Sequence, residues 1–223
     1  MLQTLINAWK IKDLRMKILY TIFIILVFRI GAQITVPYVN QDVVAAVLNG
    51  SDNVFFGYVN MLTGGAFSNA TIFAMSITPY INASIIIQLL TVAIPALERM
   101  AKEEGEEGKK KLTMITRCST VGLGLIMGWA FYSMLNNYDV ITKTGFLPGL
   151  VIVLALTAGS AVVMWLGEQI NEYGIGNGIS MILFANIISS LPAGLNTMLG
   201  MGWWAILVAV VMIALVLFII FVN

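Results

Sequence analysis

The chain of 223 residues is 59% hydrophobic and 10% charged, and its mean hydropathy is +0.92. Soluble domains contain about 25% charged residues, so this composition predicts a membrane protein that crosses the bilayer several times. The formal net charge of +1 indicates no class of partner. The chain contains no histidine and one cysteine, Cys118, which excludes disulfide frameworks, zinc sites and Cys/His catalysis within it.

The N-terminal residues 1–17 have apolar side chains at helical spacing, followed by basic residues. They form either the basic flank of the first membrane span or a short amphipathic cytosolic helix on the membrane surface. The following apolar run continues through Arg29 without a small-residue cleavage site, so we interpret 18–36 as the first span and not as a signal peptide. Charges inside spans usually face protein or water, and Arg29 either reaches the outer interface or has a structural role in the bundle.

The most unusual stretch is 64–97, which carries no charge and yet is rich in polar and helix-weakening residues. Gly64 and Gly65 open it, and Pro79 and Asn82 lie among apolar neighbours. Hydrocarbon offers no hydrogen-bond partner to backbone groups freed by glycine or proline, so such backbone must be covered by protein or line a cavity. We therefore predict a broken segment that faces the inside of a helix bundle, beside a wet or gated space.

The lengths of the apolar runs divide this region further. Residues 37–53 form a polar, acidic connection, and 54–69 are apolar but shorter than the roughly 20 residues that a spanning helix needs. We predict a re-entrant half helix over 54–69 and the second true crossing over 72–97.

The charged loop predicted over 98–117 indicates how the chain is oriented. Its second half contains Lys109, Lys110, Lys111 and Arg117. With a cytosolic N-terminus, the basic residues outside the spans fall in cytosolic segments, and Lys143 alone falls in an outer loop. This asymmetry is what the positive-inside rule requires.

Four further spans are expected, over 118–135, 146–166, 179–199 and 203–222. The first of them contains three glycines that favour close helix packing, Gly122, Gly124 and Gly128. The loop 167–178 has glycines spaced like a dinucleotide fingerprint, but no strand precedes them and no βαβ unit surrounds them, which excludes a nucleotide site. The chain stops directly after an apolar helix, so we expect it to be the front part of a longer protein.

The residues predict no enzyme, no metal site and no cofactor. The carboxylates lie in loops, and Ser84 or Ser180 would lack a base as nucleophile. A competing hypothesis is half of a secondary transporter, with a small-molecule or ion site at the broken helix. Such a site usually has an ionisable residue near the break, whereas here the break offers neutral polar groups and Arg29 is expected to lie elsewhere.

Several long motifs carry a family resemblance. They are FRIG at 28–31, IxVP at 34–37, GGAFSNATIFAMSITPYINASIIIQLL at 64–90, EGEEGKKKL at 104–112 and MWLGEQINEYGIGNGIS at 164–180. The chain resembles the SecY family, the central subunit of the bacterial protein-conducting channel. The resemblance covers the whole chain, from the N-terminus to the sixth of the ten helices that the family has.

The resemblance implies an all-α fold built from two inverted halves of five helices around an hourglass pore. This chain would supply the first half and the opening helix of the second. The half helix would be the plug that seals the outer funnel at rest, with the residues Phe55, Phe56, Met61, Leu62, Gly64, Gly65, Phe67 and Ser68. The crossing 72–97 would form one wall of the lateral gate, with Asn82, Ile85 and Ile86 toward the gate.

The resemblance also implies a constriction ring made of Ile77, Ile81, Leu183 and Ile187. The members of each pair are four residues apart, so each pair projects from one helix face. Branched apolar side chains can close around a chain of any sequence, and they favour dewetting of an empty pore. The alternative for each residue is ordinary core packing.

The implied function is translocation of unfolded secretory proteins across, and lateral release of membrane proteins into, the bacterial plasma membrane. The implied partners are the SecE and SecG subunits, the SecA motor, the ribosome with its nascent chain, signal sequences and membrane lipid, with no specific nucleic acid. The charged loop would contribute part of the cytosolic contact, through Arg99, Lys102, Lys109, Lys110 and Lys111. The channel itself would hydrolyse nothing.

Overall fold

A computed structural model describes residues 11–50, 54–102, 105–143 and 145–200, together with 210 and 220. Its helices are α2 (Lys12–Gly31), α3 (Gln41–Gly50), α4 (Val54–Leu62), α5 (Thr78–Ala93), α6 (Pro95–Lys102), α7 (Gly105–Asn137), α8 (Phe146–Tyr173) and α9 (Gly178–Gly200). Within these described ranges the only β pairing is two isolated bridges. The all-helical fold class is thereby confirmed. Most of the predicted N-terminal segment 1–17 and of the span 203–222 lies outside the described residues.

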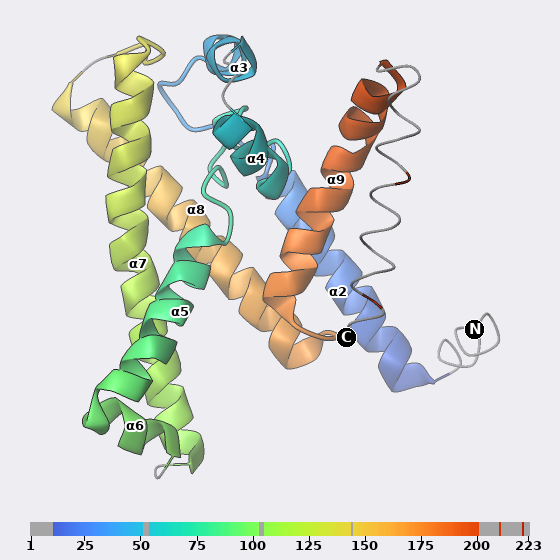
Figure 1. Ribbon diagram of the computed structural model, residues 1–223, viewed down its shortest axis with the longest axis vertical. Coiled ribbons are helices and arrows are strands. Elements are labelled where there is room, and N and C mark those ends of the chain that lie inside the picture. The colour runs from blue at the N-terminus through green and yellow to red at the C-terminus, as the bar shows by residue number, and fades with distance from the viewer. Residues whose placement is uncertain are drawn as a thin grey trace.

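Two long helices form the frame of the molecule (Figure 1), in which α8 crosses diagonally behind the upright α7. They approach closely because Gly124 and Gly128 of α7 leave room for Thr157 and neighbouring side chains of α8. A Cβ on Gly124 would lie 3.2 Å from the Thr157 methyl group. Gly122 was expected to serve the same purpose and does not, because it points away from α8 with nothing within 4 Å of its Cβ position. Residues two positions apart lie on different faces of a helix.

The helices continue beyond the apolar runs that predicted them. The third and fourth spans were expected over 118–135 and 146–166, whereas α7 has 33 residues and α8 has 28. Most of the expected loop 98–117 is therefore helical. The same holds for residues 167–173 of the expected loop 167–178. Lys, Glu and Gln are good helix formers, so a helix continues where hydrophobicity stops. Among the described helices, α7 and α8 are long and apolar enough to cross a membrane, and α5 with α6 passes the same test as a bent pair.

The second crossing differs most from its predicted range of 72–97. Helix α5 begins only at Thr78, and the chain bends by 102° between α5 and α6. The residue at the bend, Ile94, is extended and precedes Pro95. A proline disfavours helical backbone in the residue before it, which explains a helix end at this point. Helix α6 is amphipathic, with Arg99 and Lys102 in its last turn.

The first helix ends earlier than expected. Instead of continuing to residue 36, α2 ends at Gly31, and residues 32 and 33 form a turn that leads to an isolated bridge at Thr35. The Val36 N–H donates to the Ala70 carbonyl at 3.0 Å, and the Ile72 N–H donates to the Ile34 carbonyl at 2.9 Å. This short pairing attaches the chain after α2 to the chain before α5.

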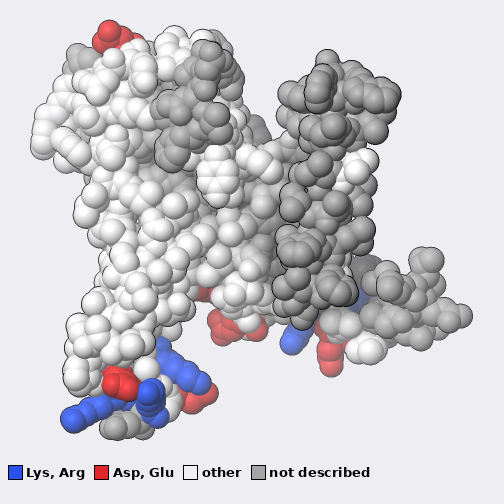
Figure 2. All heavy atoms as spheres, viewed as in Figure 1, with Lys and Arg blue, Asp and Glu red and all other residues white. Residues whose placement is uncertain are grey.

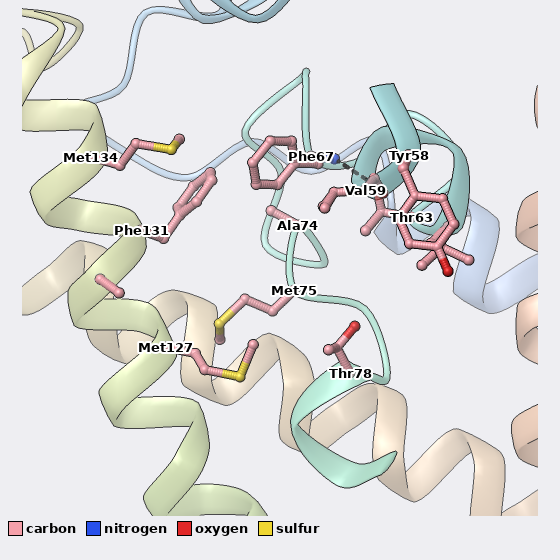
Figure 3. A pocket seen from close by; sticks show the side chains of 12 residues that line it. Tyr58, Val59, Thr63, Phe67, Ala74, Met75, Thr78, Met127, Phe131 and Met134 are labelled. Carbon is pink, nitrogen blue, oxygen red and sulfur yellow. Dashed lines mark hydrogen bonds between the residues drawn. The ribbon is translucent and has the colours of Figure 1, made fainter. Parts of the chain in front are cut away.

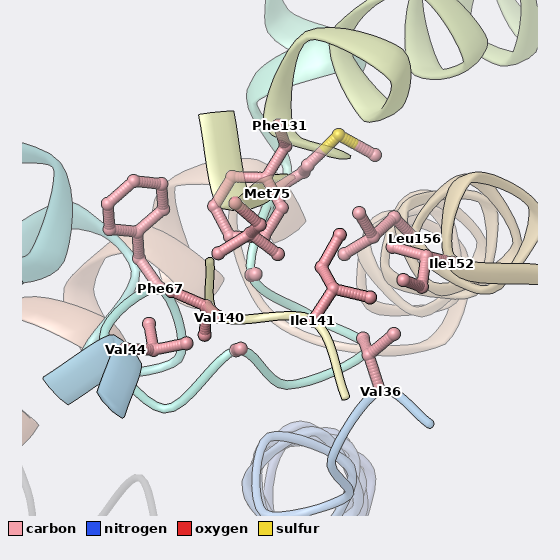
Figure 4. Close-up of a cluster of buried hydrophobic side chains, with 12 residues drawn as sticks. Val36, Val44, Phe67, Met75, Phe131, Val140, Ile141, Ile152 and Leu156 are labelled. Carbon is pink, nitrogen blue, oxygen red and sulfur yellow. The ribbon is translucent and has the colours of Figure 1, made fainter. Parts of the chain in front are cut away.

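The core consists of two clusters of buried apolar side chains. One cluster lies where α3, α7 and α8 meet the chain before α5 (Figure 4), and it contains Phe67, Met75, Phe131, Ile152 and Leu156 among others. The second joins α2, α8 and α9, with Phe28, Phe73, Ile77, Leu166 and Ile182 among its members. Both clusters contain residues from the stretch between α4 and α5, so that stretch is a central part of the core.

Candidate functional site

The segment 63–77, called here the turn segment, runs through the bundle without forming a helix. It connects α4 to α5. Four of its residues have left-handed backbone: Gly64, Gly65, Ala70 and Ser76, with φ of +61°, +87°, +44° and +48°. The two glycines end α4 because they adopt such angles without a Cβ penalty. Pro79 stands in the first turn of α5, where its missing N–H removes no hydrogen bond.

The backbone of the turn segment is supplied with hydrogen bonds by its own polar side chains and by one from α4. The Thr63 hydroxyl accepts from the Phe67 N–H at 3.2 Å, and the Ser68 N–H donates to the Asn60 side chain at 3.1 Å. The Thr71 hydroxyl donates to the Ala66 carbonyl at 3.3 Å. Thr63, Ser68 and Thr71 are themselves buried. The prediction of a broken segment whose polar residues face the inside of a bundle is confirmed for these residues.

An apolar cavity of about 440 Å³ lies between the turn segment, α4 and α7 (Figure 3). Phe67 and Met75 face it from the turn segment, and Met127, Phe131 and Met134 face it from α7. Tyr58 and Val59 contribute from α4. Thioether side chains adapt to irregular space, which suits Met75, Met127 and Met134 to the lining of this cavity.

The predicted plug residues occupy α4 and the first half of the turn segment. Positions 55 and 56 lie in α4, and their side chains lie outside the described part of the structure. Met61 is exposed, Leu62 is partly buried, and Phe67 and Ser68 are buried. The helix ends at Leu62, so the half helix is shorter than the predicted 54–69 and the remainder is turn.

The four predicted ring residues have unequal environments. Ile77 is 0% exposed and lies against Gly167 of α8, whereas Ile187 is 36% exposed. Ile81 and Leu183 are partly buried beside the second core cluster. The Ile81 N–H donates to the Ile77 carbonyl at 3.1 Å, so the pair is related by one helical turn.

The predicted gate residues lie on the outer side of α5. Asn82, Ile85 and Ile86 are exposed, while Ala83 and Ile87 of the same helix are buried. The exposed side of α5 is therefore mainly apolar, and no described residue covers it.

Sequence reasoning missed the position of Arg29. The guanidinium was expected to lie away from the break, and that expectation was wrong. It donates from Nη1 to the Gly64 carbonyl at 3.4 Å and from Nη2 to the Ala185 carbonyl. No local pattern could have identified these acceptors, because they are backbone atoms 35 and 156 positions away.

Charged side chains gather at one end of the molecule (Figure 2), where α6, the start of α7, the end of α8 and the start of α2 lie. Arg99, Lys102, Lys109, Lys110 and Lys111 belong to this end and are exposed. Lys102 donates to Glu98 at 2.7 Å, and this hydrogen bond lowers the pKa of Glu98. The contact is present above the ordinary carboxyl range and is lost as the pH falls through the lowered pKa.

One ion pair at this end connects two long helices. Arg117 of α7 holds Glu168 of α8 through two contacts of 2.9 Å, from Nε to Oε1 and from Nη2 to Oε2. The Glu168 side chain is 16% exposed and that of Arg117 is 53% exposed. We expect Glu168→Gln to lower the free energy of unfolding by at most about 1 kcal/mol, because solvent screens the arginine side. Denaturation of the purified full-length protein at low and high salt measures the effect.

The matched control for this prediction is Glu107→Gln, which removes an exposed carboxylate near the start of α7. The loss in Glu168→Gln should shrink at high salt, since ions screen partly exposed pairs. An equal loss in both variants would contradict a specific role for the contact between α7 and α8.

These features define a class of protein: a multi-pass helical membrane protein whose bundle encloses a half helix and a non-helical segment. The family model described as SecY matches residues 71–223. The chain belongs to the SecY family, which confirms the resemblance in its motifs.

Two curated relatives show how much of the family's length is present. The protein translocase subunit SecY of Bacillus subtilis (strain 168) is 46% identical over 197 residues, and that of Streptomyces scabiei is 40% identical over 240 residues. The matches cover 86% and 98% of this chain but 44% and 55% of the relatives. The chain therefore spans about half the length of the curated relatives that it matches.

Two solved structures share the fold. They are Sec61 in the canine ribosome-channel complex from the endoplasmic reticulum and a structure described as that of a protein conducting channel. Each has a TM-score of 0.58 and 17% identity, and the match covers 81% of this chain and 38% of the other. At this identity the likeness establishes the arrangement of the helices alone.

Proposed function

We propose that this chain supplies the first half of the pore-forming subunit of a protein-conducting channel. The observation that carries the proposal is the turn segment, a non-helical stretch inside a helical bundle and preceded by a half helix. Such backbone is tolerated in membranes where protein covers it or where it lines a cavity. Membership of the SecY family supports a channel for unfolded polypeptides over other uses of a broken helix.

In this proposal α4 and the turn segment as far as residue 69 act as the plug, while Ile77, α5 and α9 present the constriction. Three of the predicted ring residues keep part of their side chains exposed, namely Ile81, Leu183 and Ile187. Ile77 is fully buried in the core. An apolar ring offers no hydrogen bonds to ions and adapts to passing side chains. The exposed apolar side of α5, with Ile85 and Ile86, is the surface that a signal sequence would meet at the lateral gate.

The charged end of the molecule is proposed to face the cytosol, together with the N-terminus, in the bacterial plasma membrane. Basic residues concentrate there, as the positive-inside rule predicts. A ribosome or the SecA motor would dock on that side and supply the energy, and the chain itself would catalyse no reaction. SecE and SecG are the proposed companion subunits. Part of the docking surface is proposed to consist of the basic residues Arg99, Lys102, Lys109, Lys110 and Lys111.

One observation favours the transporter hypothesis: the ionisable side chain of Arg29 lies at the broken segment. Both of the hydrogen bonds described for its guanidinium go to backbone carbonyls of this chain. An arginine engaged in this way stabilises the protein and leaves less capacity for an anionic substrate. The channel therefore remains the better proposal.

Site-specific crosslinking tests the ring. A photoreactive residue is placed at Ile81 or Ile187 of the full-length channel while a secretory substrate is stalled in transit. We expect crosslinks to the substrate from both positions. The matched control is Ile126 of α7, which is 67% exposed and on another helix, and which should give none. Absence of crosslinks at both ring positions, with the substrate demonstrably in transit, would mean that these aliphatic residues belong only to the core.

A further inference from the structure

Three polar side chains lie between α9 and the chain that runs from the end of α4 through the turn segment. Arg29 comes from α2, and Asn186 and Ser190 come from one face of α9, four residues apart. The Arg29 guanidinium bridges the Gly64 carbonyl, at 3.4 Å, and the Ala185 carbonyl of α9. The Ser190 hydroxyl lies within hydrogen-bond distance of two carbonyls, that of Asn186 in its own helix at 3.2 Å and that of Met61 at the end of α4 at 3.4 Å. Arg29 thus connects the first part of the turn segment to α9.

Asn186 makes the connection to the other end of the turn segment. It is 0% exposed, and its amide nitrogen donates to the Ser76 hydroxyl at 3.1 Å, just before α5. Its Oδ1 atom has no hydrogen-bond partner among the described residues. A buried amide oxygen without a hydrogen-bond partner raises the free energy of the folded state. A movement of neighbouring groups that brings a donor to Oδ1 would remove this cost.

Gly64 is the point at which these groups converge. A Cβ at this position would lie 2.9 Å from Arg29 Nη1 and 3.0 Å from Asn186 Oδ1. The absence of a side chain is therefore what allows the guanidinium and the amide to close over the backbone. Gly65, the next residue, also has positive φ, but the nearest atom to its Cβ position is Asn69 Nδ2 at 4.0 Å.

We propose that Arg29 and Asn186 are positioning residues that clasp the turn segment to α9 and so hold the plug in its resting place. The inference rests on the proposed channel function. Because the clasp includes α9, which carries two of the ring residues, a displacement of α9 by a passing chain withdraws the Ala185 carbonyl and the Asn186 amide together. The plug is then released by the same movement that widens the ring.

The test is the resting ion conductance of the full-length channel in planar bilayers, without substrate. We expect Arg29→Met to raise it roughly tenfold or more, because hydrogen bonds to a charged group are among the stronger ones. Arg29→Lys should give an intermediate value, since an ammonium is a single point charge and cannot bridge two carbonyls as a planar fork does. Channel amount in the membrane is measured alongside, so that a misfolded variant is recognised.

Two glycine variants test the clasp without changing its side chains. Gly64→Ala should raise the resting conductance as Arg29→Met does, and the double variant should conduct no more than either single one. Gly65→Ala is the matched control, because it introduces similar backbone strain with no contact to the clasp, and it should leave the conductance near the original value.

Two outcomes would overturn the inference: an unchanged resting conductance in Arg29→Met and Gly64→Ala, or an equal rise in Gly64→Ala and Gly65→Ala. Crosslinks from Ile81 and Ile187 in the unaltered channel separate this result from failure of the proposed function. If those crosslinks form and the conductances do not change, the channel proposal stands and the clasp does not.

Discussion

Replacing Gly159 with alanine is expected to lower the free energy of unfolding of the full-length channel by about 3 kcal/mol or more, the upper range for overpacking a core. Gly159 lies on α8 directly against the turn segment. Its Cβ would sit against the Ile72 carbonyl oxygen, 2.8 Å from the carbonyl carbon and 2.6 Å from Cγ2. Two of these neighbours are backbone atoms, so no change of rotamer relieves the clash.

The measurement is the unfolding of purified variants in mixed micelles. Gly122→Ala on α7 is the control, because its Cβ position has nothing within 4 Å. That variant should unfold at the same or a somewhat higher denaturant concentration, since alanine is more favourable than glycine in a helix by about 1 kcal/mol. A Gly159→Ala protein as stable as Gly122→Ala would show that α8 does not press on the turn segment.

Phe28→Ala is expected to cost about 3 kcal/mol of stability, in the range for Phe→Ala in a packed core. Phe28 of α2 is 0% exposed, and its ring stacks on Phe73 of the turn segment with 5.5 Å between centroids. Gly31, one turn further along α2, leaves the space that the Phe73 ring occupies, since a Cβ there would lie 2.7 Å from Phe73 Cζ. Removal of the Phe28 ring leaves a void that a helix on one side and a turn on the other cannot easily close.

The same unfolding measurement serves, with Phe23→Ala as control. Phe23 is on the same helix and is 58% exposed, so its truncation removes comparable volume without opening the core. The double variant with Phe73→Ala should lose less than the sum of the two single losses, because each ring is the other's partner. Additive losses would contradict the stacked pair as a unit.

Local sequence patterns were enough to predict the helical class and the interruption before α5. Glycine, proline and buried-type polar residues in an uncharged apolar stretch have few structural explanations in a membrane. The exact end of the interruption was not predictable in the same way. Residues 72–77 are as apolar as a helix would be, yet they turn. The Ile72 N–H donates to the Ile34 carbonyl after α2, the next backbone bonds are local turn bonds such as Ser76 N–H to the Phe73 carbonyl, and the side chains fill two core clusters.

The candidate site was predictable only in part for the same reason. The ring and gate residues were expected from motifs, and the environment of Ile77 shows how a tertiary contact, here with Gly167, determines what surface a residue retains. The Arg29 contacts depend on backbone acceptors, which carry no side-chain signature. The bend before α6 was not predicted, because 72–97 was treated as one crossing although Pro95 is a local signal for a helix end. No local signal gives its angle of 102°, and α6 packs against α7.

The long separation between Arg29 and Ala185 has a consequence for the order in which the protein is built. The two residues are 156 positions apart, and ribosomes add about 5 to 20 residues per second, so roughly 8 to 30 s pass between their synthesis. Throughout that interval the Arg29 guanidinium, in the last turn of α2, has no α9 carbonyl to bind, and charged side chains near helix ends reach for the membrane interface. We therefore expect the Arg29 end of α2 to stay near water or lipid headgroups until nascent α9 emerges, so that an early part of the chain reaches its final contacts late.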